Sequence, residues 1–266
     1  MQYPDDMAAP TLGQDQSGIT FGPLRTPERA VPPTPSAGPL GTVSVMLALL
    51  HTSPVHVPVF DALRDAEAPG LALRHLVHPQ LLDRARAQGP EAVSAEVSAV
   101  LADAAGHGAR AVLCTCSTIG AVAETAGAAL GLPALRVDRP MAAAAVATGP
   151  RIAVLAALES TLAPTEALIN EEALRAGREV GVRTVLVPGA WGRFESGDTD
   201  GYLSAVAAAA REVRDADVIV LAQASMAPAA ERFDGGIPVL SSPRLGLLAA
   251  AQRATSDSSF SGLRTM

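Results

Sequence analysis

Two stretches of the chain are similar enough to indicate a duplicated fold. ARAVLCTCSTIGAVAE begins at Ala109 and ADVIVLAQASMAPAAE begins at Ala216, an offset of 107 residues. Each is an apolar run that passes through a few polar residues into an alanine-rich stretch. Upstream, VMLALLHTSPVHVP at 45–58 resembles IAVLAALESTLAPT at 152–165 at nearly the same spacing. The sequence therefore predicts two related halves.

After Gly41, short apolar runs alternate with longer helical patterns. Strands that alternate with helices predict an α/β fold with mostly parallel sheets. The strands are almost wholly apolar, which indicates that helices cover both faces of each sheet. The expected strands are 43–50, 71–77, 110–115, 133–137, 151–157, 182–188, 217–222 and 237–240. The expected helices are 55–67, 90–105, 119–130, 140–147, 164–178, 200–214, 226–232 and 243–254.

These patterns predict two α/β domains that follow an N-terminal arm. Residues 1–40 are rich in Pro, Gly, Thr and Asp without an apolar period, which is typical of a disordered arm. The first domain is expected at 41–148 and the second at 149–239, with a C-terminal helix within 240–266 that returns to the first. Because parallel strands present their carboxyl ends to one edge, we expect a ligand cleft between the two halves.

Composition excludes several classes of function. The formal net charge is −7, aromatic residues make up 3% of the chain and no basic block occurs, which argues against a nucleic-acid partner. The apolar run at 43–50 is too short to span a bilayer, so no membrane partner is expected. The acidic opening MQYPDDMAAP does not have the pattern of a secretory signal, and two cysteines one residue apart make a poor disulfide framework. We therefore expect a cytoplasmic protein.

The first junction between strand and helix is Cys116-Ser117-Thr118. The free N–H groups at the start of a helix attract anions and stabilise a thiolate. Hydroxyls at the next two positions can cap the helix or bind a ligand. The junction therefore suits a carboxylate and a reactive sulfur at Cys116, whereas Cys114, inside the strand, is expected to be a core residue.

The strand-Cys-Ser-Thr-helix pattern resembles the Cys-Asn-Thr motif of the aspartate/glutamate racemase superfamily, which includes hydantoin racemases, maleate isomerase and arylmalonate decarboxylase. The resemblance extends to RVDRPMAAAAVATGPRIAVLAALESTLAPT and DADVIVLAQASMA, and it spans about 43–250. It implies two domains related by a pseudo-twofold axis, a small carboxylate substrate, no cofactor, no metal and a homodimer. In the racemases of this superfamily, each domain supplies one cysteine, and the pair flanks the α-carbon of the substrate.

The chain departs from that pattern at one position. The first cysteine corresponds to Cys116, but the second position falls on Gln223. Glutamine exchanges no proton at accessible pH, although it can bind a carboxylate or a carbonyl. Cys114 is a poor substitute, because side chains two residues apart on a strand leave the same face.

A second acid or base must therefore come from elsewhere if the enzyme works from two sides. His51, at the end of the first strand, is the leading candidate, since histidine titrates near neutrality. His78, after the second strand, is expected to help bind the substrate. Glu159 is a third possibility. His56, His75 and His107 receive no role from the pattern.

Polar groups near the predicted strand ends are expected to bind the substrate carboxylate and to stabilise an enediolate. A single well-placed donor supplies about 3 kcal/mol of such stabilisation. These residues are Thr52, Ser53, Ser117, Thr118, Thr161, Gln223, Ala224 and Ser225.

Three functions remain open. The first is a cofactor-independent isomerase or racemase, with Cys116 as one base. The second is a one-thiol lyase of the arylmalonate decarboxylase type, in which Cys116 protonates the product. The third is a paralogue that binds a carboxylate without catalysis. Arg193 can reach a second carboxylate and Trp191 can form a wall of the pocket, but both lie in a loop of uncertain course, so the substrate itself is left open.

Overall fold

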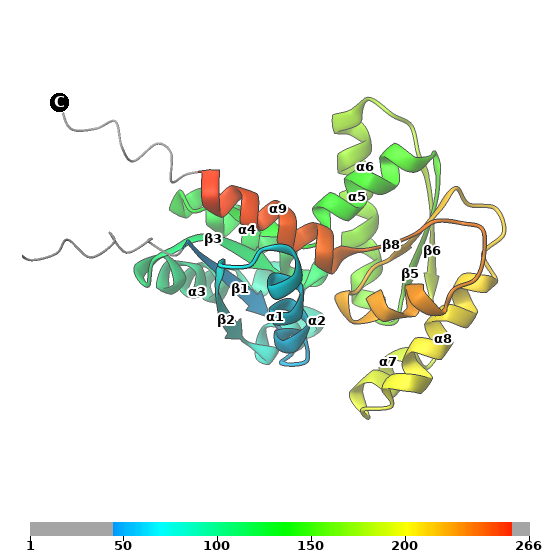
Figure 1. Cartoon of the computed structure of the whole chain (residues 1–266), viewed down its shortest axis with the longest axis horizontal. Coiled ribbons are helices and arrows are strands. Elements are labelled where there is room, and N and C mark those ends of the chain that lie inside the picture. The colour runs from blue at the N-terminus through cyan, green and yellow to red at the C-terminus, as the bar shows by residue number, and fades with distance from the viewer. Residues whose placement is uncertain (1–44, 257–266) are drawn as a thin grey trace, which may run out of the picture. The chain divides into compact units, whose positions relative to one another are not determined.

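The computed structural model describes residues 45–256 (Figure 1). The arm predicted at 1–40, and the end of the segment 240–266, fall outside these residues. None of the helices within 45–256 is long and apolar enough to cross a membrane.

The first half contains a four-stranded parallel sheet with the order β2-β1-β3-β4. Leu49 of β1 pairs with His75 on one side and Leu113 on the other. Because all four strands run the same way, their carboxyl ends share one edge, where a ligand can bind. The strands are β1 (Met46–His51), β2 (Ala72–Val77), β3 (Ala109–Cys114) and β4 (Ala134–Arg136).

The second half repeats this sheet with the order β6-β5-β7-β8, again fully parallel. The identical strand order in the two halves agrees with the internal repeat and confirms the predicted α/β class. The strands are β5 (Arg151–Ala156), β6 (Gly181–Leu186), β7 (Val218–Leu221) and β8 (Val239–Ser241).

Nine α-helices and four 3₁₀ segments lie among the strands of residues 45–256. Two of the helices, α2 and α7, were not predicted. The segment expected as a helix at 226–232 is a 3₁₀ segment that contains Pro228. The α-helices are α1 (His56–Glu67), α2 (Pro79–Gln88), α3 (Ser94–Gly106), α4 (Gly120–Leu130), α5 (Arg139–Thr148), α6 (Leu162–Ala176), α7 (Ala190–Glu195), α8 (Thr199–Arg211) and α9 (Ser242–Ser256). The 3₁₀ segments are η1 (Pro90–Val93), η2 (Ser117–Ile119), η3 (Glu159–Thr161) and η4 (Ala224–Arg232).

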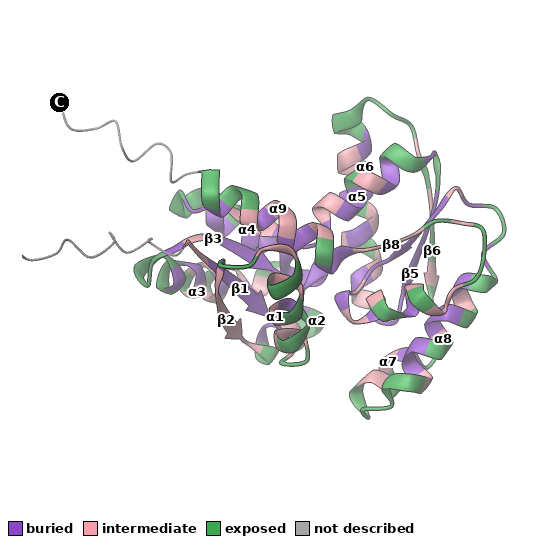
Figure 2. Ribbon diagram, viewed as in Figure 1, coloured by how far each residue is buried: buried purple, intermediate pink, exposed green. Residues whose placement is uncertain are grey.

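The central strands are buried on both faces, as their apolar sequences predict (Figure 2). On β3, Val112 and Cys114 pack into the core under α3 and α4, whereas Leu113 packs into a separate core with Leu247 of α9. Truncating such a side chain to alanine typically costs 2–5 kcal/mol. Burial therefore fixes which residues reach the sheet edge.

The two halves exchange a helix. Helix α5 follows β4, yet Met141 and Ala145 pack with Ile152 against the second sheet. Helix α9 follows β8, yet Leu247 packs against the first sheet with Leu49. The sequence division at 148 groups α5 with the first half, whereas its packing lies with the second.

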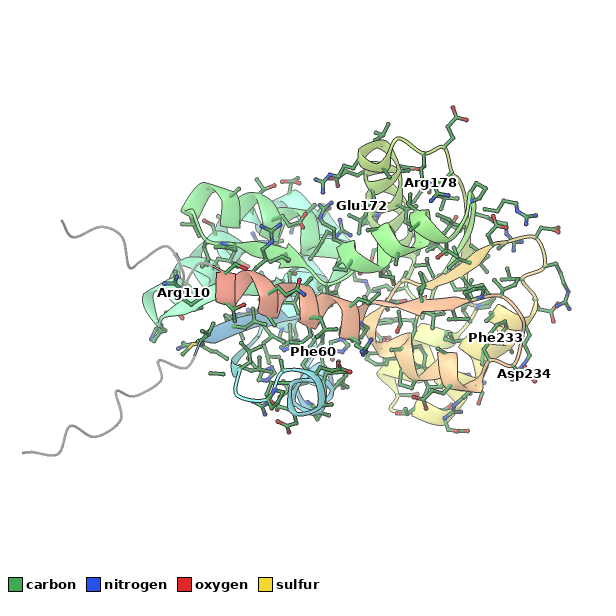
Figure 3. The ribbon with its side chains drawn as sticks, turned by 45° about the horizontal axis from the view of Figure 1, so that its top comes forward. Phe60, Arg110, Glu172, Arg178, Phe233 and Asp234 are labelled. Carbon is green, nitrogen blue, oxygen red and sulfur yellow. The ribbon has the colours of Figure 1, made fainter. Side chains whose placement is uncertain are left out.

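Close packing and ion pairs strengthen this exchange. A Cβ at Gly246 of α9 would lie 2.5 Å from the carbonyl oxygen of Val137, so only glycine fits there. At the start of α5, Arg139 pairs with Glu124 of α4 and, at 2.5 Å, with Glu172 of α6. Glu172 is labelled in Figure 3 on α6. These contacts hold the two halves together near the edge where the strands end.

Candidate active site

A cavity of about 250 Å³ opens where strands of both sheets end. Its lining combines small polar side chains from the strand ends with larger side chains from α2 and α7. The lining residues are Thr52, Ser53, Pro54, His56, Pro79, Leu82, Asp83, Arg86, Thr115, Cys116, Ser117, Thr118, Leu158, Thr161, Trp191, Phe194, Glu195, Gln223, Ala224 and Ser225.

Cys116 lies between β3 and η2, lines this cavity and is 9% exposed. Cys114 is fully buried, and its thiol donates to the carbonyl oxygen of Cys116 at 3.6 Å. Burial, together with the neighbouring Cys116, raises the pKa of Cys114 well above its ordinary value. Cys114 therefore remains a neutral thiol, and Cys116 is the sulfur that reaches the cavity.

Gln223 occupies the equivalent place at the end of β7, and it lines the same cavity. Its amide oxygen accepts hydrogen bonds from the backbone N–H of Ala157 at 2.6 Å and of Leu158 at 3.3 Å. Because a backbone N–H can only donate, these bonds fix the orientation of the amide. The amide NH₂ has no hydrogen-bond partner among residues 45–256, so it is available to a ligand.

A hydrogen bond joins the two junctions. The Ser117 hydroxyl donates to the carbonyl oxygen of Ala222, the residue before Gln223, at 3.0 Å. Its only proton is used in this bond, so Ser117 can offer a ligand an acceptor but not a donor. Ser117 therefore connects the halves directly beside Cys116.

A buried ion pair contacts the first junction, which is the segment Cys116-Ser117-Thr118 after β3. Arg136 donates to both carboxylate oxygens of Asp138, at 2.7 and 2.8 Å, and both side chains are almost fully buried. The same guanidinium donates to the carbonyl oxygens of Ser117 and Pro164. No such pair lies beneath Gln223 among the described residues. The polypeptide around Cys116 is thus fixed by charge-assisted bonds.

The other hydroxyls predicted to bind substrate also reach the cavity. Ser225 is already paired, because its hydroxyl lies 2.8 Å from the Tyr202 hydroxyl. The remaining four have no hydrogen-bond partner for their side-chain oxygen among residues 45–256, so they are free to bind an anion. They are Thr52, Ser53, Thr118 and Thr161.

His51 is not brought to the cavity, contrary to the expectation for an acid or base at the cleft edge. Its ring is fully buried, with Nδ1 2.8 Å from the Thr115 hydroxyl and Nε2 2.8 Å from Nδ1 of His75. The outer nitrogen of His75 lies 3.3 Å from a carboxylate oxygen of Asp61. Burial, together with His56 and His75, lowers the pKa of His51 to about 3. The side chain leaves β1 on the same face as Leu49 and packs against Phe60 of α1, with 5.7 Å between the ring centroids, and it is neutral at neutral pH.

His56 takes the position that the sequence suggested for His51. It begins α1 and lines the cavity, and burial lowers its pKa to about 4. The sequence feature that indicates this placement of His56 is the loop HTSPVH, which is short enough to return the chain to the end of β1. His78 precedes α2 and accepts a hydrogen bond from Gln80 at 3.3 Å, but it does not line the cavity. Glu159 is exposed and lies outside the lining.

The wall away from the strand ends comes from the two helices that were not predicted. Helix α2 contributes Leu82 and Arg86, and α7 contributes Trp191 and Phe194. The two aromatic rings stack at 5.1 Å between centroids, and the Arg86 guanidinium lies 5.9 Å from the Trp191 centroid. Arg193 instead pairs with Asp198 at 2.7 Å and does not line the cavity.

Two duplicated parallel sheets with a cavity at their carboxyl ends define a class of α/β proteins that bind a ligand between two related halves. Within that class, the chain belongs to the family described as Asp/Glu/Hydantoin racemase, which it matches over residues 57–250. No curated protein matches the chain in sequence.

Solved structures of racemases and of a decarboxylase have the same fold. A glutamate racemase from Bacillus anthracis is 19% identical with a TM-score of 0.62, over 83% of this chain and 84% of that one. An aspartate racemase from Picrophilus torridus is 14% identical with a TM-score of 0.54, over 80% and 94%. A mutant of arylmalonate decarboxylase in its sulfate-associated form is 19% identical with a TM-score of 0.53, over 79% and 93%.

Proposed function

We propose that the chain is a cofactor-independent enzyme that transfers a proton at the carbon next to the carboxylate of a small acid, with Cys116 as its acid–base group. The observation that carries this proposal is that Cys116 and Gln223, at equivalent junctions of the two halves, line one cavity. Family membership supports an isomerase of the racemase type as the first candidate.

In this reaction the Cys116 thiolate removes the α-proton, and the electron pair of the C–H bond moves into the carboxylate to form an enediolate. The hydroxyls of Thr118 and Thr161 and the amide NH₂ of Gln223 donate to the enediolate oxygens. Donors held in place before the reaction stabilise such an anion by about 3 kcal/mol each. The Cys116 thiol then returns a proton to the carbon.

Inversion of configuration requires a second group on the opposite face of the substrate. Gln223 cannot supply a proton, and His56 is the only imidazole in the lining of the described cavity. Its pKa of about 4 makes it a neutral and weak base at neutral pH. An isomerase of this design therefore exchanges the α-proton faster than it inverts the centre.

The fixed amide favours a second candidate, a one-thiol decarboxylase. In that reaction the bond between the α-carbon and one carboxylate of a malonate breaks, carbon dioxide leaves, and the electron pair forms an enediolate on the remaining carboxylate. Cys116 then delivers its proton to the carbon from one face. Gln223 needs only to donate hydrogen bonds, which its held geometry allows.

Proton exchange in deuterated water tests the proposal. We expect α-deuteration of a substituted acetate or an amino acid, followed by proton NMR, with retention in excess of inversion. Carbon dioxide release from a malonate identifies the decarboxylase instead. Because a general acid–base group contributes 10²–10⁴-fold, Cys116→Ala lowers either rate by about that factor.

Cys114→Ala is the matched control, since it removes the other thiol without touching the cavity. We expect it to retain most of the activity. Equal activity of the Cys116→Ala variant and the unaltered protein on the same acid would contradict the proposal.

A further inference from the structure

The wall formed by α2 and α7 differs in chemistry from the polar edge of the same cavity. Apart from three charged residues, its side chains are apolar or aromatic, and they come from both halves of the chain. The chain has a single tryptophan and five phenylalanines, and the tryptophan and one phenylalanine lie in this wall. The apolar members are Pro79 and Leu82 of α2 and Trp191 and Phe194 of α7, and Pro54 and Leu158 add apolar surface to the lining beside the strand ends.

The aromatic rings form a row that leads to the second junction. Trp191 stacks on Phe194 at 5.1 Å, and Phe194 lies 5.3 Å from Tyr202. The Tyr202 hydroxyl bonds the Ser225 hydroxyl at 2.8 Å. Aromatic contacts of this kind hold a ring in one orientation and contribute about 0.5–1.5 kcal/mol each. The wall therefore presents the half-buried rings of Trp191 and Phe194 in fixed orientations.

The charges in this wall do not suit a second carboxylate. Arg86 is the only lysine or arginine in the lining of the described cavity, and two carboxylates, Asp83 and Glu195, line it as well. The guanidinium lies 4.0 Å from Glu195 and over the Trp191 ring. A dicarboxylate bound with one end at the strand edge would place its other charge beside two acidic side chains.

We propose that the site selects an acid whose α-substituent is uncharged, flat and apolar, and that this substituent lies between Leu82 and Arg86 of α2 and Trp191 and Phe194 of α7. This inference deepens the proposed function and rests on it for the position of the carboxylate. Arg86 acts through its stem and its stacking on the indole. Aspartate and glutamate, which carry a second carboxylate, are excluded.

The fluorescence of Trp191 provides a test that does not require turnover, because this residue is the only tryptophan in the chain. The full chain is titrated with phenylacetate, succinate and propionate, which share one carboxylate and differ in the distal group. We expect phenylacetate to change the fluorescence and to bind at least tenfold more tightly than the other two. Tighter or equal binding of succinate would overturn the inference, as would the absence of any response to phenylacetate.

Two aromatic substitutions distinguish an effect of the wall on binding from a general effect on the fold. Phe194→Ala is expected to weaken phenylacetate binding about tenfold, since ring stacking contributes about 1 kcal/mol beyond the buried area. Phe233→Leu changes a phenylalanine outside the cavity, labelled in Figure 3, and is expected to leave binding within twofold. Equal loss in both variants would contradict the assignment of the wall.

A third substitution tests the role of Arg86. Arg86→Gln is expected to reduce phenylacetate affinity less than threefold and to leave succinate weak. If Arg86 instead binds a second carboxylate, the unaltered protein prefers succinate and the variant loses that preference.

Exchange in deuterated water distinguishes failure of this inference from failure of the proposed function. Exchange of phenylglycine but not of aspartate supports both. Exchange of aspartate but not of phenylglycine overturns only the inference. Phenylacetate binding without exchange of phenylacetate or of either amino acid, and without carbon dioxide release from a malonate, overturns only the proposed function.

Discussion

The two strand-to-helix junctions occupy the same place in the two halves, yet they provide different chemistry. At the end of β3, Cys116 follows an apolar strand and rests above the buried Arg136–Asp138 pair. At the end of β7, Gln223 is held by two backbone N–H groups at the end of β5. Duplication thus produced matching positions, of which one can carry a proton and the other can only hold a hydrogen bond.

The substitution Gln223→Cys removes this chemical difference most directly, because it puts a thiol at both junctions. Because a correctly placed acid–base group contributes 10²–10⁴-fold, we expect inversion to rise by about that factor over the unaltered protein. Chiral chromatography of the deuterated product measures it. Inversion that stays at the original rate while Cys116-dependent exchange continues would show that the second position does not face the α-carbon.

The ion pair beneath the first junction predicts a large difference in stability. Asp138→Asn removes the charge that balances a buried guanidinium and is expected to cost about 3–5 kcal/mol. Urea unfolding followed by circular dichroism gives the value. The double variant Arg136→Met, Asp138→Leu serves as the control, and it should recover much of the loss. A cost for Asp138→Asn under about 1 kcal/mol would contradict the assigned role of the pair.

The hydrogen-bonding role of Gln223 predicts a smaller effect on catalysis. Gln223→Leu removes a donor to the enediolate, and we expect a loss of about 10²-fold in kcat with little change in KM. It also leaves the N–H of Ala157 without its acceptor, which costs about 1–3 kcal/mol of stability. Steady-state kinetics alongside thermal unfolding separates the two losses. An unchanged kcat would mean that the amide makes no contact with the reacting atoms.

Acidification should lower the free energy of unfolding through two histidines of the first half, because both have lowered pKa values in the folded protein. The pKa of His51 is about 3 and that of His56 is about 4 in the folded protein, whereas both are near 6.5 in the unfolded chain. The unfolded chain therefore binds protons first, and stability falls as the pH drops below 6.5. The loss is about 2 kcal/mol per histidine by pH 5. His51→Asn should flatten this dependence in urea titrations between pH 7 and 5, and an unchanged slope would count against the burial of a neutral ring.

The cavity also has two regions that differ in how well the sequence predicts them: the edge where the strands end, and the wall formed by α2 and α7. The eight strands within residues 45–256 were predicted to within a few residues, because continuous apolar runs are strong signals of strands buried on both faces. The resulting edge contains Cys116, Gln223 and the unpaired hydroxyls. Trp191 lines the cavity, as expected of a residue that walls the pocket, but it lies on helix α7 and not in a loop, and Arg193 does not line the cavity.

The distal wall was not predicted for physical reasons. Helix α7 has only six residues and includes Gly192, so its periodicity is too short to detect. Helix α2 buries only Leu81 and Ala85, with Leu82 and Arg84 half-buried and the rest exposed, which hides its apolar face. Arg86, which lies on this helix, was missed with it. His56 was overlooked because its contacts depend on how the loop after β1 folds back.

The most direct test of whether a single thiol reaches the cavity is alkylation of the folded protein with iodoacetamide. Peptide mass spectrometry then identifies the modified cysteine. The account predicts a single modification per chain, on Cys116, with loss of activity in parallel and protection by a bound carboxylate. Modification of Cys114 at a comparable rate, or full activity in a protein alkylated at Cys116, would contradict it.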